Sequence, residues 1–228
     1  MRVLVTRPLE DGADTARELA LRGHEALLAP LLVTQFFDGP QIALDGVQAI
    51  LVTSANGVRA LARRTSRRDL PVFAVGPQTM AEARKLGFGE VKNADGNAED
   101  LARATRKWAK PEDGALLHVA GEGNDGKLAA ALSDFSVRRE ILYAVTPVKM
   151  LPSEAVSALR NGGVDMALFF SPRSAAVFRD LVAGEGLALD RVQAAAISAA
   201  TAAALAPLRF AALHVAPRPN LENLLNLL

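Results

Sequence analysis

The feature of the sequence that most constrains its fold is a regular alternation of short apolar runs with longer amphipathic segments. The apolar runs are rich in Val, Leu and Ile, and the segments between them carry apolar residues at helical spacing. This alternation is typical of βαβ units in a mostly parallel sheet that helices cover on both faces. We therefore expect an α/β fold with strands at residues 2–6, 26–33, 48–53, 71–75, 89–93, 115–120, 139–145, 165–170, 192–197 and 211–216.

Capping residues mark the expected helix starts between these strands. Ser54 and Asn97 each precede a helical pattern, and acidic residues that suit a first turn follow the Asn. A proline at a first-turn position follows Ser171, and Asn220 precedes the last helical pattern. Gly87 predicts a helix end, because glycine readily adopts the left-handed conformation of a C-terminal cap.

One strand-and-helix design occurs twice along the chain. Residues 51–61 (LVTSANGVRAL) parallel residues 168–178 (LFFSPRSAAVF). Residues 75–81 (VGPQTMA) parallel residues 197–203 (ISAATAA), in the same order and at nearly the same separation. Two domains of similar design are therefore expected.

The pairing of the remaining segments leaves two arrangements open. Residues 1–34 parallel residues 113–147, so the two types of unit alternate along the chain. The domains are then either in tandem, 1–110 followed by 111–228, or interleaved, with 34–147 inserted between the two parts of the other domain. Periodicity alone does not choose between these arrangements.

Composition excludes several classes of protein. Half of the 228 residues are apolar and 22% are charged, which is typical of a globular protein and not of a disordered chain. The longest apolar runs, such as 26–33, are far shorter than the roughly 20 residues that cross a bilayer. Residues 1–4 are typical of a strand and not of a signal peptide, so we expect a cytoplasmic protein without a membrane partner.

Charge and cysteine content narrow the chemistry further. The net charge is +1, and the basic residues are dispersed apart from Arg63–Arg64 and Arg67–Arg68, so no nucleic-acid partner is expected. The absence of cysteine excludes disulfides, thiolate nucleophiles and cysteine metal sites. His24, His118 and His214 show no metal-ligand spacing, and we expect structural roles for them and no metal.

The loop 121–127 (GEGNDGK) fits two nucleotide-binding patterns, G-x-G-x-x-G and G-x-x-x-x-G-K. The second pattern needs Ser or Thr after the lysine to hold magnesium, but Leu128 stands there. The first pattern needs an acidic residue at the end of the next strand, whereas Glu140 precedes the apolar part of its strand. We interpret the glycines as a tight turn, with a nucleotide-dependent enzyme as the third-ranked alternative.

Small hydroxyl and amide residues recur where predicted strands give way to helices. Open α/β sheets bind ligands at these strand ends, and a helix N-terminus there favours carboxylate or phosphate. Capping alone accounts for any one of them, but their recurrence at five strand ends predicts a ligand with several anionic groups. The candidate binding residues are Thr6, Arg7, Thr53, Ser54, Asn56, Gly76, Thr79, Ser171, Arg173, Ser174, Ser198 and Thr201.

At these positions the sequence resembles the uroporphyrinogen-III synthase family, over essentially the whole chain. The resemblance depends on the order and spacing of short segments. They are 3–8 (VLVTRP), 51–57 (LVTSANG), 75–81 (VGPQTMA) with 86–88 (LGF), Tyr143, 169–172 (FFSP) and 201–205 (TAAAL).

The resemblance implies the interleaved arrangement. Two similar domains with parallel sheets flanked by helices would be joined by a two-strand linker. Domain 1 would contain 1–34 and 148–228, domain 2 would contain 38–143, and the linkers would lie near 34–38 and 143–148. The resemblance also implies that a linear tetrapyrrole with eight carboxylates lies between the domains, with no cofactor.

Three positions depart from the family's pattern. Ser198 stands where glycine is expected, which bears on how closely the backbone approaches one carboxylate. Ala120 stands where arginine is common, and Val145 stands where threonine is usual. These departures concern the roles of single residues and not the family.

The resemblance further implies a cyclising hydro-lyase of tetrapyrrole biosynthesis. The terminal hydroxyl of hydroxymethylbilane departs as water, and the far ring attacks the resulting azafulvene through its substituted carbon. The spiro intermediate then fragments and recloses with that ring inverted, which gives uroporphyrinogen III. We expect a monomer whose substrate, hydroxymethylbilane, is delivered by hydroxymethylbilane synthase. The alternative function is that of a non-catalytic two-domain binding protein, or a paralogue, for a polycarboxylate ligand.

Tyr143 is the only tyrosine of the chain and the candidate catalytic residue. The pyrrole nitrogens supply much of the electronic push, so the protein mainly folds the substrate and assists one leaving group. A phenol stays protonated at neutral pH and can donate to the departing hydroxide without adding charge among carboxylates. A packing role in a half-buried strand is the alternative for Tyr143.

Overall fold

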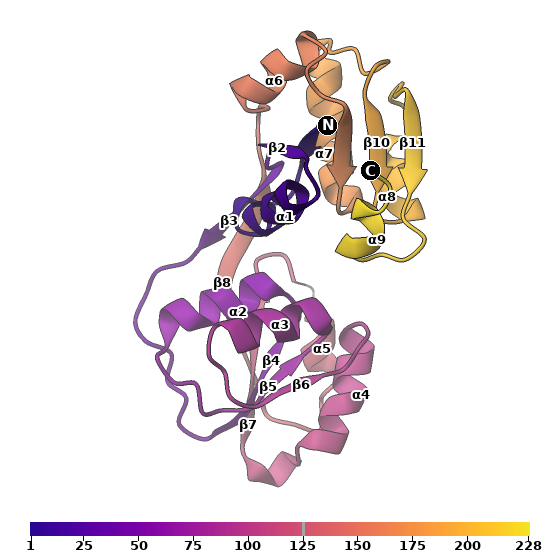
Figure 1. Ribbon diagram of the computed structural model, residues 1–228. Coiled ribbons are helices and arrows are strands. Elements are labelled where there is room, and N and C mark those ends of the chain that lie inside the picture. Colours follow the sequence, from indigo (N-terminus) through magenta and orange to yellow (C-terminus); the bar gives the residue numbers. More distant parts are fainter. Residues whose placement is uncertain (125) are drawn as a thin grey trace. The chain divides into compact units, whose positions relative to one another are not determined.

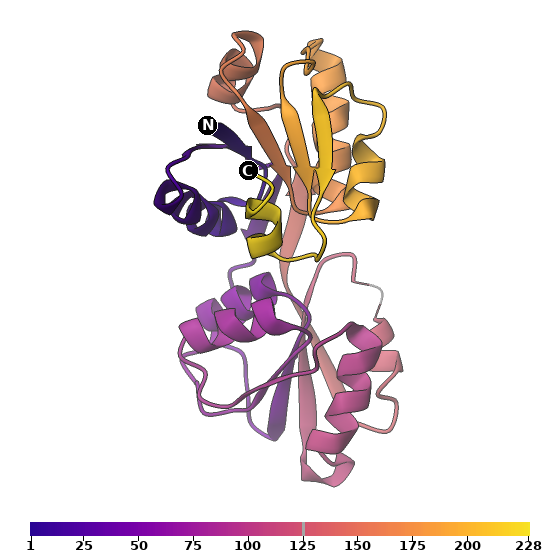
Figure 2. The same ribbon diagram turned by 45° about the vertical axis from the view of Figure 1, so that its right-hand side comes forward.

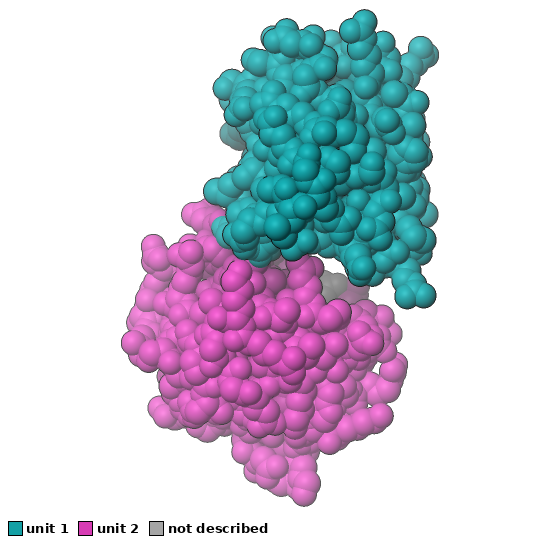
Figure 3. All heavy atoms as spheres, in the orientation of Figure 1, with its two compact units in different colours: residues 1–33, 146–228 teal, residues 34–145 magenta. Residues whose placement is uncertain are grey.

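The computed structural model describes residues 1–124 and 126–228, which form two compact units (Figure 3). Unit 1 contains residues 1–33 and 146–228, and unit 2 contains residues 34–145. Each unit is built on a mainly parallel sheet with helices on both faces (Figure 1). The expected α/β fold, with two similar parallel-sheet units and an interleaved chain, is confirmed.

Unit 1 alternates strands with helices. Its strands are β1 (Arg2–Val5), β2 (Glu25–Leu28), β9 (Met166–Phe169), β10 (Gln193–Ala196) and β11 (Ala212–Val215). Its helices are α1 (Leu9–Leu21), α6 (Ser153–Arg160), α7 (Pro172–Glu185), α8 (Ala199–Leu205) and α9 (Leu221–Leu225). The strand order is β11-β10-β9-β1-β2, and every neighbouring pair is parallel.

Both faces of this sheet are buried, as the helices on either side of it in Figure 2 indicate. Helices α6, α7 and α8 cover the face that carries Leu4 and Phe169. Helices α1 and α9 cover the face that carries Val5 and Leu168. Because successive strand residues point to opposite faces that are both apolar, the strands have continuous apolar runs instead of an alternating pattern.

Unit 2 repeats this design with one more strand. Its strands are β3 (Leu32–Phe36), β4 (Val47–Val52), β5 (Val72–Ala74), β6 (Val91–Asn93), β7 (Ala115–Gly121) and β8 (Val137–Pro147). Its helices are α2 (Ala55–Arg64), α3 (Pro77–Lys85), α4 (Ala98–Trp108), the 3-10 helix η1 (Pro111–Asp113) and α5 (Lys127–Ala130). The strand order is β3-β8-β7-β4-β5-β6.

Two apolar layers also cover the sheet of unit 2. Helices α2 and α3 pack on the face that carries Val52 and Leu117. Helix α4 and the segment that begins at α5 pack on the other face, around Leu51. There the ring of Trp108, the only tryptophan of the chain, packs edge-on against Phe73 with 5.1 Å between the ring centroids.

Strands β3 and β8 carry the chain between the two units. The N–H of Phe37 donates to the carbonyl of Leu142 at 2.8 Å, and the N–H of Val148 donates to the carbonyl of Leu31 at 3.0 Å. The paired residue numbers rise along one segment and fall along the other. The two segments are therefore antiparallel, whereas the other neighbouring strands of the two described sheets are parallel.

The single strand expected at 26–33 is wrong. The structure has β2 and β3 there, separated by residues 29–31. Pro30 explains the break, because it has no N–H to donate to a ladder and restricts the backbone of the residue before it. The apolar run continues through the break because Leu31 is buried in the core of unit 1.

The predicted helix caps are confirmed. The side chain of Ser54 accepts a hydrogen bond from the N–H of Gly57, and Asn97 forms a capping box with Asp100. Gly87, at a φ of +87°, follows the end of α3. Equivalent positions in the two units cap equivalent helices, namely Ser54 and Ser171, Gly76 and Ser198, and Asn97 and Asn220.

Arg64, the last residue of α2, and Arg68, just beyond it, bind backbone carbonyls of other segments. Arg64 donates to the carbonyls of Phe37 and Pro40 at 3.1 and 2.9 Å. Arg68 donates to the carbonyl of Leu86 at 2.9 Å and lies over a phenylalanine ring.

Within residues 1–124 and 126–228, no helix combines the length and apolar character that crossing a bilayer requires.

Candidate functional site

The carboxyl ends of neighbouring strands bring candidate residues to one edge of unit 2. Ser54 follows β4 and Gly76 follows β5, while β7 ends at Gly121. Tyr143 of β8 is paired with Gly121 in the sheet register. Because β8, β7, β4 and β5 are adjacent, these residues lie along the edge at which open parallel sheets bind ligands.

A hydrogen bond joins Tyr143 to Ser54. The phenol and hydroxyl oxygens are 2.7 Å apart, and either group could donate. The same Ser54 oxygen accepts the N–H of Gly57 at 3.1 Å, at the start of α2. Tyr143 is 7% exposed, so the protein itself holds the ring in place.

The environment of Tyr143 keeps its phenol protonated. Burial raises the pKa of Tyr143 above 10.0, because the charged phenolate is poorly solvated there, and the hydrogen bond to Ser54 acts in the opposite direction. At neutral pH the group is therefore a neutral donor, which is the state that assistance to a departing hydroxide requires.

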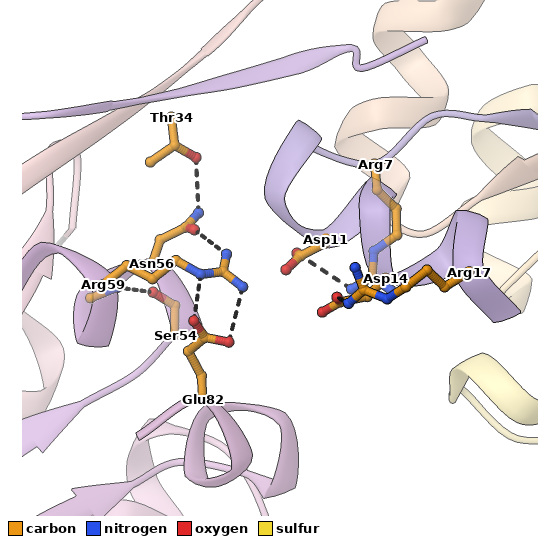
Figure 4. A network of polar contacts seen from close by, with 10 residues as sticks. Arg7, Asp11, Asp14, Arg17, Thr34, Ser54, Asn56, Arg59 and Glu82 are labelled. Carbon is orange, nitrogen blue, oxygen red and sulfur yellow. Dashed lines mark hydrogen bonds and ion pairs between the residues drawn. The ribbon is translucent and has the colours of Figure 1, made fainter. Parts of the chain in front are cut away.

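Asn56 lies in a polar network that links β3, α2 and α3 (Figure 4). Its amide nitrogen donates to the hydroxyl of Thr34 at 3.0 Å, and its amide oxygen accepts from Arg59 at 3.0 Å. Arg59 also binds both carboxylate oxygens of Glu82, at 2.8 and 3.2 Å. Both ends of the Asn56 amide thus have protein partners, and its contact with a ligand stays a prediction.

The start of α3 is more open than the start of α2. Gly76 is the N-cap residue and supplies no side chain, so the first N–H groups of α3 have no side-chain cap. Apart from the adjacent residues, no described atom would lie within 4 Å of a Cβ built on Gly76. Thr53 is half-buried beside Ser54, whereas Thr79 in the first turn of α3 is buried.

Unit 1 presents a comparable polar edge at its adjacent strands β1, β9 and β10. Thr6 follows β1 but is fully buried, and its hydroxyl donates to the carbonyl of Leu168 at 2.6 Å. Arg7 forms an ion pair with Asp11 at 3.4 Å (Figure 4). It also lies over the ring of Phe170, 4.7 Å from the ring centroid. The charge of Arg7 is therefore already partly compensated.

The serine caps of unit 1 pair with hydroxyls in the first turn of their own helices. Ser171 accepts the N–H of Ser174, and their hydroxyl oxygens are 3.0 Å apart. Ser198 and Thr201 repeat this geometry, also at 3.0 Å. Ser174 and Thr201 are buried, whereas Arg173 is exposed.

The environment of His118 differs from that of the other two histidines, which are only half-buried. Within residues 1–124 and 126–228, no three His, Cys, Asp or Glu side chains are grouped to hold a metal ion. His118 is fully buried in β7, and among the described residues neither of its ring nitrogens has a hydrogen-bond partner. Burial lowers the pKa of His118 to about 4, and the positive charge of Arg139 acts in the same direction.

The backbone conformation and packing of the loop 121–127 account for its glycines. Gly123 and Gly126 have φ values of +76° and +73°, which confirms the predicted tight turn. A Cβ built on Gly121 would lie 2.8 Å from two ring carbons of Tyr143. Asp125, which also belongs to this loop, lies outside the described residues.

Sequence reasoning missed Gly121 and Thr34 as neighbours of site residues. The position of this glycine at the end of a predicted strand is a signal for a close approach of another group, in addition to the turn that the loop pattern predicts. Nothing in the sequence linked Thr34 to Asn56, because side-chain pairs between separate elements depend on tertiary packing.

Together, the fold and the two polar edges define a class of protein: a two-unit α/β protein with hydroxyl groups and helix starts at the carboxyl ends of parallel strands. A family model described as uroporphyrinogen-III synthase HemD matches residues 13–226. The chain belongs to this uroporphyrinogen-III synthase family.

Similar proteins carry the same name. A uroporphyrinogen-III synthase from Schizosaccharomyces pombe is 29% identical over 110 residues, which is 46% of this chain and 44% of that protein. The matched region thus spans less than half of that relative. The structure of the Helicobacter pylori 26695 enzyme matches with a TM-score of 0.65 at 16% identity, covering 100% of this chain and 98% of that one. A mutant enzyme from the extremely thermophilic bacterium Thermus thermophilus gives 0.51 at 18% identity, covering 99% and 96%.

Proposed function

We propose that the protein converts hydroxymethylbilane to uroporphyrinogen III, with loss of water and inversion of the terminal pyrrole ring. The observation that carries this proposal is the family match over residues 13–226, which includes most of both units. The product feeds tetrapyrrole biosynthesis, whose end products include haem, sirohaem, cobalamin and chlorophyll.

Tyr143 is the proposed proton donor. In the first step the bond between the hydroxymethyl carbon and its oxygen breaks, a pyrrole nitrogen supplies the electron pair, and the phenol gives the departing hydroxide a hydrogen bond or proton. What supports this role is the buried, neutral phenol at the carboxyl edge of the sheet, next to the start of α2. The later bond-forming steps take place between parts of the substrate, so the protein needs no covalent nucleophile.

The substrate's carboxylates are proposed to bind at several helix starts. The open N-terminus of α3 at Gly76, the half-buried Ser171 and the exposed Arg173 support this assignment. Thr6, Thr79, Ser174 and Thr201 are buried, so their proposed effect on binding is exerted through the helix starts that they order. The remaining proposed binding residues are Arg7, Thr53, Ser54, Asn56 and Ser198.

We also infer the domain limits and the setting of the reaction. Domain 1 would contain 1–34 and 148–228 and domain 2 would contain 38–143, with the antiparallel segments near 34–38 and 143–148 as linkers. The antiparallel hydrogen bonds between β3 and β8 support this assignment of the linkers. A cytoplasmic monomer that receives hydroxymethylbilane from hydroxymethylbilane synthase fits the chemistry, because the free bilane also cyclises unaided to the type I isomer.

Product isomer analysis tests the proposed reaction. The purified protein is mixed with hydroxymethylbilane in the presence of a chelator and without nucleotide, and the products are oxidised and separated. The type III isomer is expected. A mixture identical to the protein-free type I control would refute the proposal.

A further inference from the structure

We propose that Ser54 and Gly121 are positioning residues for Tyr143: Ser54 donates its hydroxyl hydrogen to the phenol oxygen, and Gly121 makes room for the ring. This inference rests on the proposed function for its catalytic consequence. The hydrogen-bond geometry that it assigns can be tested without any substrate. All three residues belong to unit 2 and lie on its central strands or directly after them.

The first step concerns the hydrogen of Ser54. Its oxygen accepts the N–H of Gly57 at the start of α2, so its own hydrogen must point elsewhere. The phenol oxygen of Tyr143, 2.7 Å away, is in place to accept it at an ordinary O–H···O distance. Two successive hydrogen bonds then point the same way: the N–H of Gly57 donates to Ser54, and the hydroxyl of Ser54 donates to Tyr143.

The direction of these hydrogen bonds matters for catalysis. If Ser54 donates to Tyr143, no other described residue accepts the phenol hydrogen, which can then be directed at a leaving group. Because the N–H of Gly57 polarises the Ser54 hydroxyl, Ser54 becomes a better donor. Hydrogen bonding to the phenolate form also partly offsets the effect of burial on the pKa of Tyr143. Ser54 thus assists proton donation through Tyr143, a role separate from its proposed contact with a substrate carboxylate.

Gly121 leaves the space that the ring of Tyr143 occupies. It is paired with Tyr143 in the register of β7 and β8, and the N–H of Glu122 donates to the Tyr143 carbonyl at 2.7 Å. A Cβ on Gly121 would lie 2.8 Å from two ring carbons, closer than such atoms pack, and 3.1 Å from the phenol oxygen. The ring would have to move, which would break its contact with Ser54. The first glycine of the apparent nucleotide loop is therefore explained by Tyr143.

The corresponding serine of unit 1 has a different kind of partner. Ser171 caps α7 as Ser54 caps α2, but its hydroxyl lies 3.0 Å from Ser174 of its own helix. A cap requires only the hydrogen bond from the helix N–H. The additional contact with Tyr143 distinguishes Ser54 from an ordinary capping serine.

The single tyrosine makes the proposal measurable in the full-length protein without substrate. Ultraviolet resonance Raman spectra of the tyrosine Fermi doublet report whether the phenol donates or accepts a hydrogen bond. The parent should show the signature of an acceptor. Ser54→Ala should lose that signature and raise the midpoint of the tyrosinate absorbance titration, whereas Ser54→Thr should retain both. Ser171→Ala, which removes a matched cap, should leave Tyr143 unchanged in both measurements.

The kinetic arm separates positioning from binding. We expect Ser54→Ala to lower kcat by about 3- to 10-fold, as loss of one neutral hydrogen bond predicts. Loss of its proposed carboxylate contact would appear separately, as a higher KM. Gly121→Ala should both lower kcat and change the Raman signature. If the variant has the same Trp108 fluorescence as the parent, unit 2 is folded in it.

The outcomes distinguish this inference from the proposed function. A Raman signature and a titration midpoint that are unchanged in folded Ser54→Ala would overturn the positioning role, whatever the activity. If Tyr143→Phe is as active as the parent, the catalytic role of Tyr143 fails, and with it the kinetic consequence assigned to Ser54. If the spectra change as expected and kcat also falls, the positioning role is supported.

Discussion

Arg59 of α2 and Glu82 of α3 form a two-point ion pair, with N–O distances of 2.8 and 3.2 Å. Their side chains are only 11% and 12% exposed. Arg59 also holds the amide oxygen of Asn56, which in turn binds Thr34 of β3. One nearly buried pair thus connects the two helices that cover one face of the unit 2 sheet with the strand that enters this unit.

The Arg59–Glu82 ion pair predicts that removing one partner lowers the stability of unit 2 strongly. Glu82→Gln should lower the free energy of unfolding of unit 2 by about 3 kcal/mol, because a buried guanidinium loses its counter-charge. Urea unfolding followed by the fluorescence of Trp108, which lies in unit 2, measures this change. As a control, Asp69→Asn removes a solvent-exposed partner of Arg67 and should move the transition little. Equal effects of the two substitutions would contradict the structural importance of the Arg59 pair.

His118 predicts acid sensitivity of the fold. Its pKa is about 4 in the folded protein and near the ordinary 6.5 in the unfolded chain, so the unfolded state binds more protons between these values. Stability contributed by the neutral histidine is complete above pH 6.5 and falls as the pH falls toward 4, by roughly 3 kcal/mol in total. Chemical unfolding at a series of pH values should show this slope.

His118→Leu provides the matching control for that slope. Leucine has no titrating group and suits the apolar layer around Leu116 on the same face of β7. We expect the variant to lose much of the pH dependence between 6.5 and 4, whereas His214→Gln, at a less buried position, should keep it. A slope that is the same in His118→Leu as in the parent would assign the acid sensitivity to other groups.

Anion binding should be distributed over several helix starts. Thr79→Ala, Ser171→Ala and Thr201→Ala should each weaken binding of the uroporphyrinogen III product by about 0.5–1.5 kcal/mol. Isothermal titration of the folded variants measures this, and Asn220→Ala, a cap outside the proposed site, serves as the control. Complete loss of binding in one folded variant would indicate a single dominant site instead.

The interleaved chain predicts which fragments fold. A fragment of residues 34–145 keeps β7 between β8 and β4 and should unfold cooperatively. A fragment of residues 1–110 contains β4 but lacks β7, its central neighbour, and should not fold cooperatively. Circular dichroism and urea titration of both fragments measure this. A folded 1–110 beside an unfolded 34–145 would support the tandem arrangement.

The sequence predicted local features well because short-range chemistry determines them. Ser54, Asn97, Ser171 and Asn220 cap helices as expected, since a cap depends on a few adjacent residues. The internal repeat predicted two similar units for a comparable reason, because it preserves strand ends and caps together. Pro30 shows the limit of this reasoning, since the apolar run around it continued while the strand did not.

Contacts between distant residues were not predictable. Ser54 and Tyr143 are 89 residues apart, and only the register of β7 and β8 and the start of α2 bring them together. That the ring nitrogens of His118 have no hydrogen-bond partner in the described part of the chain likewise depends on what packs around β7. For the candidate site, the sequence therefore indicated which strand ends matter, and the structure supplied the partners of each side chain.

Isomer analysis of the parent and Tyr143→Phe, side by side on hydroxymethylbilane, tests the central claim most directly. The phenylalanine variant keeps the ring over Gly121 but loses the donor, so its fold should be preserved while its turnover falls about 10²-fold or more. The parent should then yield the type III isomer, and the variant should yield mainly the type I isomer of the unassisted reaction. A parent that gives only type I, or a variant that matches the parent in rate and isomer ratio, would contradict the account.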